Sequence, residues 1–299
     1  MLPPLVLNVY KPPGVTSQKV VAKLKRELRG QVKKIGHFGT LDPFAEGLLL
    51  IGINGAQRLN DFVHNDYTKT YVAHGLLGVE TDTGDPEGEV LQRDETEYFR
   101  KEISKFTEPF LQEFLTKEFL GEYWQSPHKF SAAKFQGRAL HEWARAGVEI
   151  EKPQVKRHVH KIEVLSFDFP KLVIRFEVSS GTYIRSLFAD CAKRLGTLGS
   201  LEGLVRERVG AISYQDKEQE LDQLLKNSLS PEVVLGYPKI YFREKEAKLL
   251  RNGVILKQDR AIDSDKVAEG EKIWAFDEQD NRIGLYSMEN GSFRAICNL

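Results

Sequence analysis

The chain has 299 residues, of which 41% are apolar and 29% are charged, and its 43 basic residues balance its 43 acidic ones. These proportions are typical of a soluble globular protein with one or two domains. Two cysteines exclude a disulfide framework and a cysteine-based zinc site, and no apolar run reaches the roughly 20 residues that span a membrane. The first residues lack the pattern of a signal peptide, so we expect a cytoplasmic protein with no membrane partner.

The neutral total conceals an uneven distribution of charge. Residues 11–40 carry eight Lys or Arg and one Glu, a net of +7, and residues 128–162 carry eight and three, a net of +5. Residues 80–122 carry five basic and thirteen acidic side chains, a net of −8. A neutral protein can still present a basic face to phosphates. The charges alone leave open whether these segments bind nucleic acid or are ordinary solvated surface.

Up to residue 120 the pattern predicts strands and helices in alternation. Ser17 is a favourable N-cap for a helix that reaches about Leu28 and carries a basic face. Helical periodicity returns over residues 95–120, after a polar turn region at 79–88. The predicted strands of this half span residues 5–10, 48–53 and 70–77.

From Trp124 to Gly147 the chain is basic and aromatic, with small residues in between. Such a mixture suits an arm that packs on a nucleic-acid backbone while its rings lie near bases. The same residues also fit an amphipathic helix, Leu140 to Ala146, docked on the core. The pattern alone leaves both interpretations open.

The second half combines a hairpin, a helix and a small β-rich unit. Residues 159–167 and 172–179 predict two strands joined by a turn, and a helix is predicted at 183–195. A polar connector at 215–230 leads to a domain boundary near 231–236. The strands predicted beyond it span residues 239–242, 273–276, 282–287 and 293–297.

Asp42 lies where a glycine-containing polar loop meets an apolar strand. The sequence has no phosphate-binding glycine loop after a strand and no G-x-S-x-G motif, which argues against nucleotide and serine-hydrolase chemistry. The close pair His158 and His160 lacks a third ligand nearby, so we expect no metal. Because Pro43 holds Asp42 in a turn or extended conformation, its carboxylate is either a nucleophile or base, or the acceptor of an Asx-turn.

Five sequence blocks, in order, resemble the TruB family of pseudouridine synthases. Residues 36–49, GHFGTLDPFAEGLL, match the family motif G-H-x-G-T-L-D-P-x-A-x-G-x-L throughout. The other blocks are KPPGVTS at 11–17, LGVETDTGDPEG at 77–88, SPHKFSAAKFQGRALHEWARAG at 126–147 and SSGTYIRSLFADCAKRLG at 179–196. The resemblance extends from about Leu5 to Ile212, and the last 65 or so residues resemble a PUA domain more loosely.

The resemblance implies an α+β fold with two domains. Residues 1–230 would form the pseudouridine-synthase domain, a central mixed or antiparallel sheet flanked by helices, with a thumb-like RNA-binding insertion at about 124–152. Residues 236–299 would form a small β-rich, PUA-like RNA-binding domain. The implied activity is the isomerisation of uridine-55 in the T arm of tRNA by base flipping, without cofactor or metal. The implied partner is tRNA, and we expect a monomer with no obligate protein partner.

The resemblance also assigns roles by position. Asp42 takes the role of the nucleophile that helps to break the bond between uracil N1 and ribose C1′, although whether it attacks C1′, C6 or the C2′ proton stays open. Tyr71, in TKTYVAHG, packs on the flipped uracil and is implicated in proton transfer. Arg185, in T-Y-I-R, pairs with Asp42 and holds it ionised. The remaining RNA-binding positions are Tyr183 beside the substrate, His37 in the space that the flipped base leaves, and Leu204 in the base pocket.

Two segments depart from the family pattern. Where the family often has G-x-A-T-K, Arg58 stands in place of the lysine, and where it has L-R-R-T-R-x-G-x-F, the chain loses one Arg and gains Glu207. Two alternative functions also remain: a tRNA-folding chaperone with secondary catalysis, and a pseudouridine synthase that acts on another RNA. The intact set of Asp42, Tyr71 and Arg185 favours catalysis.

Overall fold

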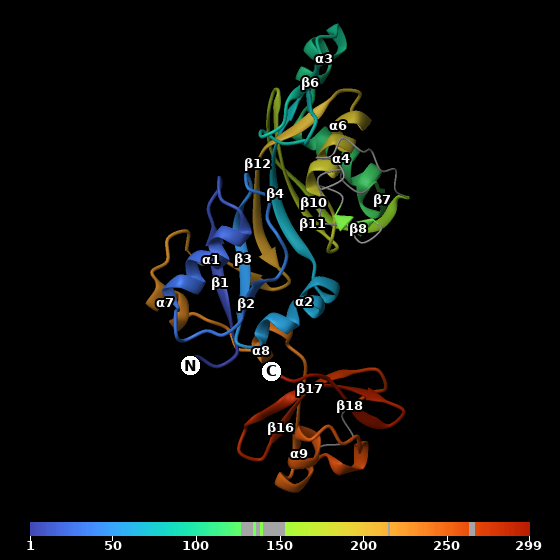
Figure 1. Ribbon diagram of the computed structural model, residues 1–299. Helices are drawn as coiled ribbons and strands as arrows, with labels where there is room; N and C mark the ends of the chain where they lie inside the picture. The colour runs from blue at the N-terminus through green and yellow to red at the C-terminus, as the bar shows by residue number, and fades with distance from the viewer. Residues whose placement is uncertain (127–133, 136–137, 140–152, 215, 263–266) are drawn as a thin grey trace.

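The computed structural model describes residues 1–126, 134–135, 138–139, 153–214, 216–262 and 267–299 (Figure 1). The strands of its main sheet are β1 (Leu5–Lys11), β2 (Ile35–His37), β3 (Glu46–Ile53), β4 (Lys69–Leu77), β7 (Gly121–Gln125), β10 (Val155–Asp168), β11 (Lys171–Val178), β12 (Gly199–Val209) and β13 (Ile212–Ser213). They run in the order β1-β3-β12-β4-β11-β10-β7, with β2 paired to β3 and β13 to β12. The β12–β3 pair is parallel and the others described in this sheet are antiparallel, which confirms the predicted mixed sheet.

Helices cover the sheet at both ends of the strand order (Figure 1). Helices α4 (Glu108–Phe119) and α6 (Ile184–Arg194) pack with β4, β10 and β11 around one apolar cluster. Helices α1 (Ser17–Glu27) and α7 (Leu221–Lys226) pack on one face of β1 and β3. The short elements near them are η1 (Ala56–Leu59), α2 (Asn60–Asp66), β5 (Val79–Thr81), β6 (Val90–Arg93), α3 (Glu97–Lys101), η2 (Ile103–Lys105), β8 (Lys134–Phe135) and β9 (Arg138–Ala139).

Strand β3 is buried on both faces, which explains its continuous apolar run. Leu49 and Ile51 point into the cluster under α1, whereas Leu48 and Leu50 belong to a second cluster on the other face. Successive strand residues point to opposite faces, so an apolar residue is needed at every position. The loop that precedes β3 is therefore attached to a rigid strand.

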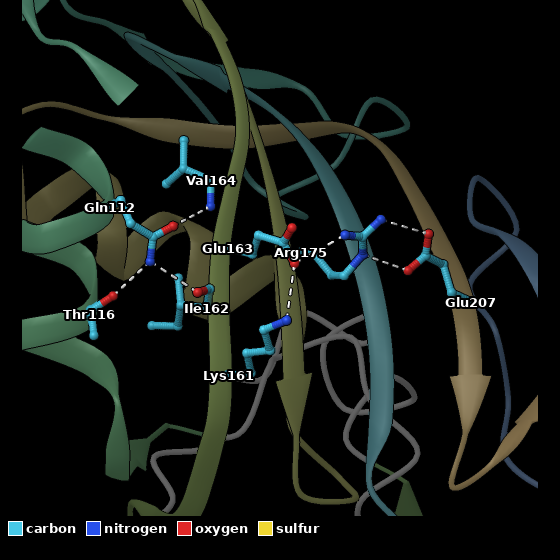
Figure 2. Close-up of polar contacts among 8 residues, drawn as sticks. All are labelled: Gln112, Thr116, Lys161, Ile162, Glu163, Val164, Arg175 and Glu207. Carbon is cyan, nitrogen blue, oxygen red and sulfur yellow. Dashed lines mark hydrogen bonds and ion pairs between the residues drawn. The ribbon is translucent and has the colours of Figure 1, made fainter. Parts of the chain in front are cut away.

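Side chains of α4 complete the edge of β10 where its neighbour β7 ends. Strand β7 pairs with Val155–Val159 of β10 and no further. Beyond that point Gln112 donates a hydrogen bond to the Ile162 carbonyl at 3.1 Å and accepts one from the Val164 amide at 2.8 Å (Figure 2). Buried backbone groups need such partners, so these bonds fix α4 against the sheet.

Two predictions about the helices are wrong in detail. Thr16 caps α1, because its hydroxyl accepts a hydrogen bond from the Lys19 amide at 3.2 Å, whereas the predicted cap Ser17 points inward. The helical pattern over 95–120 is interrupted, since Thr107 caps a separate helix, α4. Periodicity continued across the break because both pieces bury one face in the same core.

The C-terminal unit is the β-rich piece that the sequence predicts. Its sheet has the order β14-β16-β17-β18-β15. These strands are β14 (Lys239–Phe242), β15 (Leu256–Lys257), β16 (Lys272–Asp277), β17 (Arg282–Glu289) and β18 (Ser292–Cys297), and the unit also holds α9 (Glu244–Arg251) and η3 (Gln258–Arg260). Helix α8 (Pro231–Leu235) lies at the predicted boundary. Helix α9 was not predicted.

The two units share one apolar cluster. It contains Trp274, Phe276 and Leu285 from the C-terminal sheet together with Leu48 and Phe38 from the N-terminal part. The ammonium of Lys272 also lies 2.8 Å from the Asp66 carboxylate of α2. The packing of the C-terminal sheet is therefore continuous with the core below β3.

Part of the predicted RNA-binding arm lies outside the described residues. Of the segment 124–152, the structure describes residues 124–126, 134–135 and 138–139, and the alternative helix at 140–146 is not among them. None of the described helices is long and apolar enough to cross a membrane.

Candidate active site

An open pocket of about 410 Å³ lies where α6 begins, beside β4, β12 and the loop that follows β2. It is lined by all six residues that the resemblance assigns to the site: His37, Asp42, Tyr71, Tyr183, Arg185 and Leu204. A larger pocket of about 870 Å³, between α1 and residues 217–224, contains none of them. The smaller pocket is therefore the candidate active site.

Ser17 positions the residue before Asp42. Its hydroxyl donates to the Leu41 carbonyl at 3.0 Å and accepts from the Leu41 amide at 2.9 Å. The Asp42 carbonyl in turn accepts from the Ala45 amide at 3.1 Å, which closes a turn around Pro43. The backbone on both sides of Asp42 is thus held by hydrogen bonds.

Lys11 joins two loops beneath the site. Its ammonium is buried and donates to the carbonyls of Pro12, Val15 and Pro43 at 3.0, 2.7 and 3.2 Å. Burial lowers the pKa of Lys11 to about 8. The KPPGVTS block therefore acts structurally, by tying its own loop to the loop of Asp42.

Arg206 brings β12 against the same loop. Its buried guanidinium donates to the carbonyls of Leu48 and Gly39 at 2.8 and 3.1 Å. Gly47 permits this approach, since a Cβ at residue 47 would lie 2.4 Å from the Arg206 carbonyl oxygen. The glycine of the D-P-x-A-x-G motif is thus required by close strand packing.

Asp42 and Asp85 share the guanidinium of Arg185. One terminal nitrogen lies 3.1 Å from Asp42 Oδ2, and the other lies 2.8 Å from Asp85 Oδ2 and 2.9 Å from the Thr83 carbonyl oxygen. The side chains of Arg185 and Asp85 are 6% and 5% exposed, whereas that of Asp42 is 36% exposed. Arg185 is consequently held from behind while Asp42 faces the open pocket.

Asp85 was not among the predicted site residues. Its carboxylate also accepts from the Thr83 hydroxyl at 2.6 Å and from the Glu87 amide at 3.1 Å. The signal in the sequence is that Asp85 precedes a proline, as Asp42 does, inside a block that resembles the family. Spacing alone could not show that these two aspartates meet, because they are 43 residues apart in the chain.

The surroundings of Asp42 raise the pKa of its carboxyl group. Burial is the largest cause, and the negative charge of Asp85 acts in the same direction. The nearby charges of Arg185, Lys11 and Arg206 oppose the shift. The result is a carboxylate that is more basic than one in water yet still paired with a cation.

Tyr71, Leu204 and His37 form apolar or aromatic walls of the pocket. Tyr71 and Leu204 are 8% and 6% exposed and lie on the neighbouring strands β4 and β12. His37 ends β2, and its buried Nδ1 has no hydrogen-bond partner among the described residues. Burial, followed by the charge of Arg206, lowers the pKa of His37, so the ring is neutral at neutral pH.

Gln125 holds the backbone of Tyr183 at the start of α6. Its side chain donates to the Tyr183 carbonyl at 2.9 Å and accepts from the Tyr183 amide at 2.8 Å. Gln125 is 2% exposed and was not predicted as a site residue. It links the end of β7, next to the predicted arm, to the residue beside Arg185.

The two departures from the family pattern lie away from the pocket lining. Arg58 donates to the carbonyl of Asn298 in the C-terminal unit. Glu207 lies on the opposite face of the sheet, where it accepts from Arg175 at 2.8 and 3.4 Å (Figure 2). Arg175 also donates to Glu163 at 3.1 Å, so Glu207 belongs to a charged network on that face.

The described residues contain no group of three or more His, Cys, Asp or Glu that could hold a metal ion. His158 and His160 lie side by side on β10 with ring centroids 4.5 Å apart, and both are exposed.

Comparison with known proteins identifies relatives over nearly the whole chain. Residues 25–184 match the model of the TruB family pseudouridylate synthase, N-terminal domain. A tRNA pseudouridine synthase B of Clostridium tetani is 34% identical over 97% of this chain and 98% of its own length. A tRNA pseudouridine synthase B of Thermotoga maritima is 32% identical over 96% of this chain and 91% of its own length.

Solved structures agree in fold. A crystal structure of a Cbf5-Nop10-Gar1 complex superposes with a TM-score of 0.70 at 23% identity, over 99% of this chain and 83% of that chain. An H/ACA RNP bound to a substrate RNA containing 2′-deoxyuridine gives a TM-score of 0.67 at 21% identity, over 98% and 84%. At these identities the likeness shows the shared architecture of both units.

Proposed function

The chain belongs to the TruB family of pseudouridylate synthases, and from this premise we propose that it isomerises uridine to pseudouridine in tRNA, at position 55 of the T loop. The observation that carries the proposal is the convergence of Asp42, Tyr71 and Arg185 on one open pocket. Asp42 is held from behind by Arg185 and exposed in front, as a group that must meet a substrate requires. The names of the relatives support tRNA as the substrate.

In the proposed reaction the target nucleotide leaves the T-loop stack and its uracil enters the pocket beside Tyr71. Asp42 assists cleavage of the bond between N1 and C1′, the base rotates, and a bond forms between C5 and C1′. The proton lost from C5 is balanced by the proton gained at N1, so the reaction is an isomerisation. The raised pKa of Asp42 suits a nucleophile or base, and Arg185 orients it.

His37 suits the space that the flipped base leaves. A neutral ring replaces a stacked base with less loss of hydration than an imidazolium would. Insertion of such a ring offsets part of the few kcal/mol that unstacking costs. Tyr183 and Leu204 would contact the substrate from the two other walls of the pocket.

We assign the segment at about 124–152 and the unit at 236–299 to RNA binding. The excess of basic residues over 128–162 supports the first assignment. In the C-terminal unit Lys239 lies 3.4 Å from Asp280 and Arg251 lies 2.5 Å from Asp277, so part of its positive charge is already neutralised. The proposal requires no cofactor, metal or protein partner, and the protein would act as a monomer.

The main alternative is a tRNA-folding chaperone for which catalysis is secondary. The exposed basic side chains of α1 favour it as much as they favour an enzyme. Mass spectrometry of tRNA from a deletion strain tests both functions. We expect pseudouridine-55 to be lost and to return with the wild-type gene but not with Asp42→Asn. Persistence of the modification in the deletion strain would contradict the proposed function.

A further inference from the structure

The wall of the pocket that faces away from the paired aspartates contains buried positive charge. Lys69 is 5% exposed and Arg206 is 1% exposed, and both line the pocket. Lys69 lies two residues before Tyr71 on β4, so the two side chains point to the same face of the sheet. Within the described ranges, neither cation forms an ion pair with a carboxylate.

Polar groups without negative charge surround the Lys69 ammonium. It donates to the Ser180 hydroxyl at 2.8 Å, and that hydroxyl lies 3.0 Å from His64 Nδ1. Burial, followed by the charge of Arg206, lowers the pKa of Lys69 to about 7. A buried ammonium is unfavourable unless an anion compensates it, and the folded protein supplies none here among the residues described.

Two glycines leave room beside these cations. A Cβ at residue 39 would lie 3.5 Å from Lys69 Nζ and 3.7 Å from Arg206 Nη1, so Gly39 keeps a shared space next to both groups. Gly181 follows Ser180, and a Cβ there would lie 3.0 Å from a terminal nitrogen of Arg157. The rim of the pocket therefore combines positive charge, a hydroxyl and close access to backbone.

We propose that Lys69, Ser180 and Arg206 form a subsite for one phosphodiester group of the RNA backbone, next to the nucleotide whose base enters the pocket. This inference rests on the proposed function, because it needs an RNA strand at the pocket. A phosphodiester carries one negative charge and acceptor oxygens, which match an ammonium, a guanidinium and a hydroxyl donor. His64 and Arg157 lie at the entrance to this subsite.

The test measures binding of a T-arm stem-loop across a salt series, with Asp42→Asn in every protein so that the RNA is not converted. Lys69→Met should weaken binding by about tenfold and should reduce the slope of log Kd against log salt by about 0.7–0.9, the value for one phosphate contact. Lys161→Met is the matched control, because Lys161 lies on the opposite face of the sheet, paired with Glu163 (Figure 2). The control should change neither quantity.

A neutral methylphosphonate, placed in turn at each linkage beside the target nucleotide, identifies the phosphate. One position should weaken binding to the parent protein by about tenfold and should add little in Lys69→Met, because both changes remove the same contact. Ser180→Ala provides a second, smaller change, which should weaken binding by about two- to threefold at that position alone. Additive losses at every linkage, or an unchanged salt slope, would overturn the subsite.

The two proposals fail in different ways. If wild-type protein converts the T-arm uridine but Lys69→Met and Ser180→Ala bind as the parent does, the phosphate subsite is wrong and the proposed function stands. If wild-type protein neither binds nor converts this RNA, both proposals fail. Thermal unfolding of Lys69→Met should show a melting temperature at or above that of the parent, because the variant removes a buried charge.

Discussion

Arg175 and Arg185 each bind two carboxylates, one arginine on each face of the same sheet. Arg175 holds Glu163 and Glu207 across the exposed face, with its side chain 32% exposed (Figure 2). Arg185 holds Asp42 and Asp85 in the pocket, with its side chain 6% exposed. Charges near water are screened, whereas charges removed from water interact strongly and depend on their exact partners.

The difference teaches what burial adds to one arrangement of charges. On the exposed face a lost contact is replaced by water, so the network contributes little to stability. In the pocket a lost contact leaves a charge that water cannot reach, and the geometry of Asp42 changes with it. The same substitution made on both faces therefore separates a role in the site from a surface ion pair.

The largest effect is expected for Asp42→Asn. Isomerisation should fall by at least about 1,000-fold while tRNA binding stays within a few-fold, because the amide keeps the shape but is neither nucleophile nor base. The folded protein raises the pKa of Asp42, so its ionised form lowers stability at neutral pH, and the variant should melt no lower than wild type. Tritium release from 5-labelled uridine measures the activity, and substantial turnover would contradict the nucleophile assignment.

Arg185→Lys should reduce the single-turnover rate by about 100-fold although the charge is kept. An ammonium cannot bridge Asp42 and Asp85 as the planar guanidinium does, so Asp42 loses its orientation. Arg175→Lys makes the same change on the exposed face and should leave the rate within about twofold. Equal losses in the two variants would erase the distinction between the faces.

Asp85→Asn should lower the rate by about 10- to 100-fold, because Arg185 loses the partner that holds it from behind. It should also shift the acid limb of the pH–rate profile. Asp42 is active when ionised, so activity falls as the pH drops through its pKa, and Asp85 raises that pKa. Removal of the Asp85 charge lowers the pKa of Asp42 and moves the acid limb to lower pH; an unmoved limb would mean that Asp85 does not act on Asp42.

Glu207→Gln should have the smallest effect. It removes one of two carboxylates that Arg175 binds near the surface, so the free energy of unfolding should fall by no more than about 1 kcal/mol. Activity should stay at the wild-type level. Urea unfolding and the same rate assay measure both quantities. A rate loss comparable to that of Asp85→Asn would show that the charged network supports the site through the sheet.

The sequence predicted the strands of both sheets well, because apolar residues follow the strand period or, in β3, fill it on both faces. The family resemblance named the residues that line the pocket. It did not reveal Asp85, Lys69 or Gln125, whose importance depends on contacts between segments far apart in the chain. The cap of α1 was misassigned for a similar reason: the hydroxyl of Ser17 is used by Leu41, 24 residues later, and local propensity cannot show that competition.

The position of Phe38 in the cluster shared by both units has a consequence for substrate recognition. Phe38 is 2% exposed, adjoins His37, and lies four residues before Asp42, while the same cluster contains Trp274 and Phe276 of the C-terminal sheet. Free energy that a ligand adds to the packing of that sheet is therefore shared with the loop that carries the two site residues. Such coupling is reciprocal, so a nucleotide seated at Asp42 strengthens the hold of the distant unit on the rest of the molecule by the same factor.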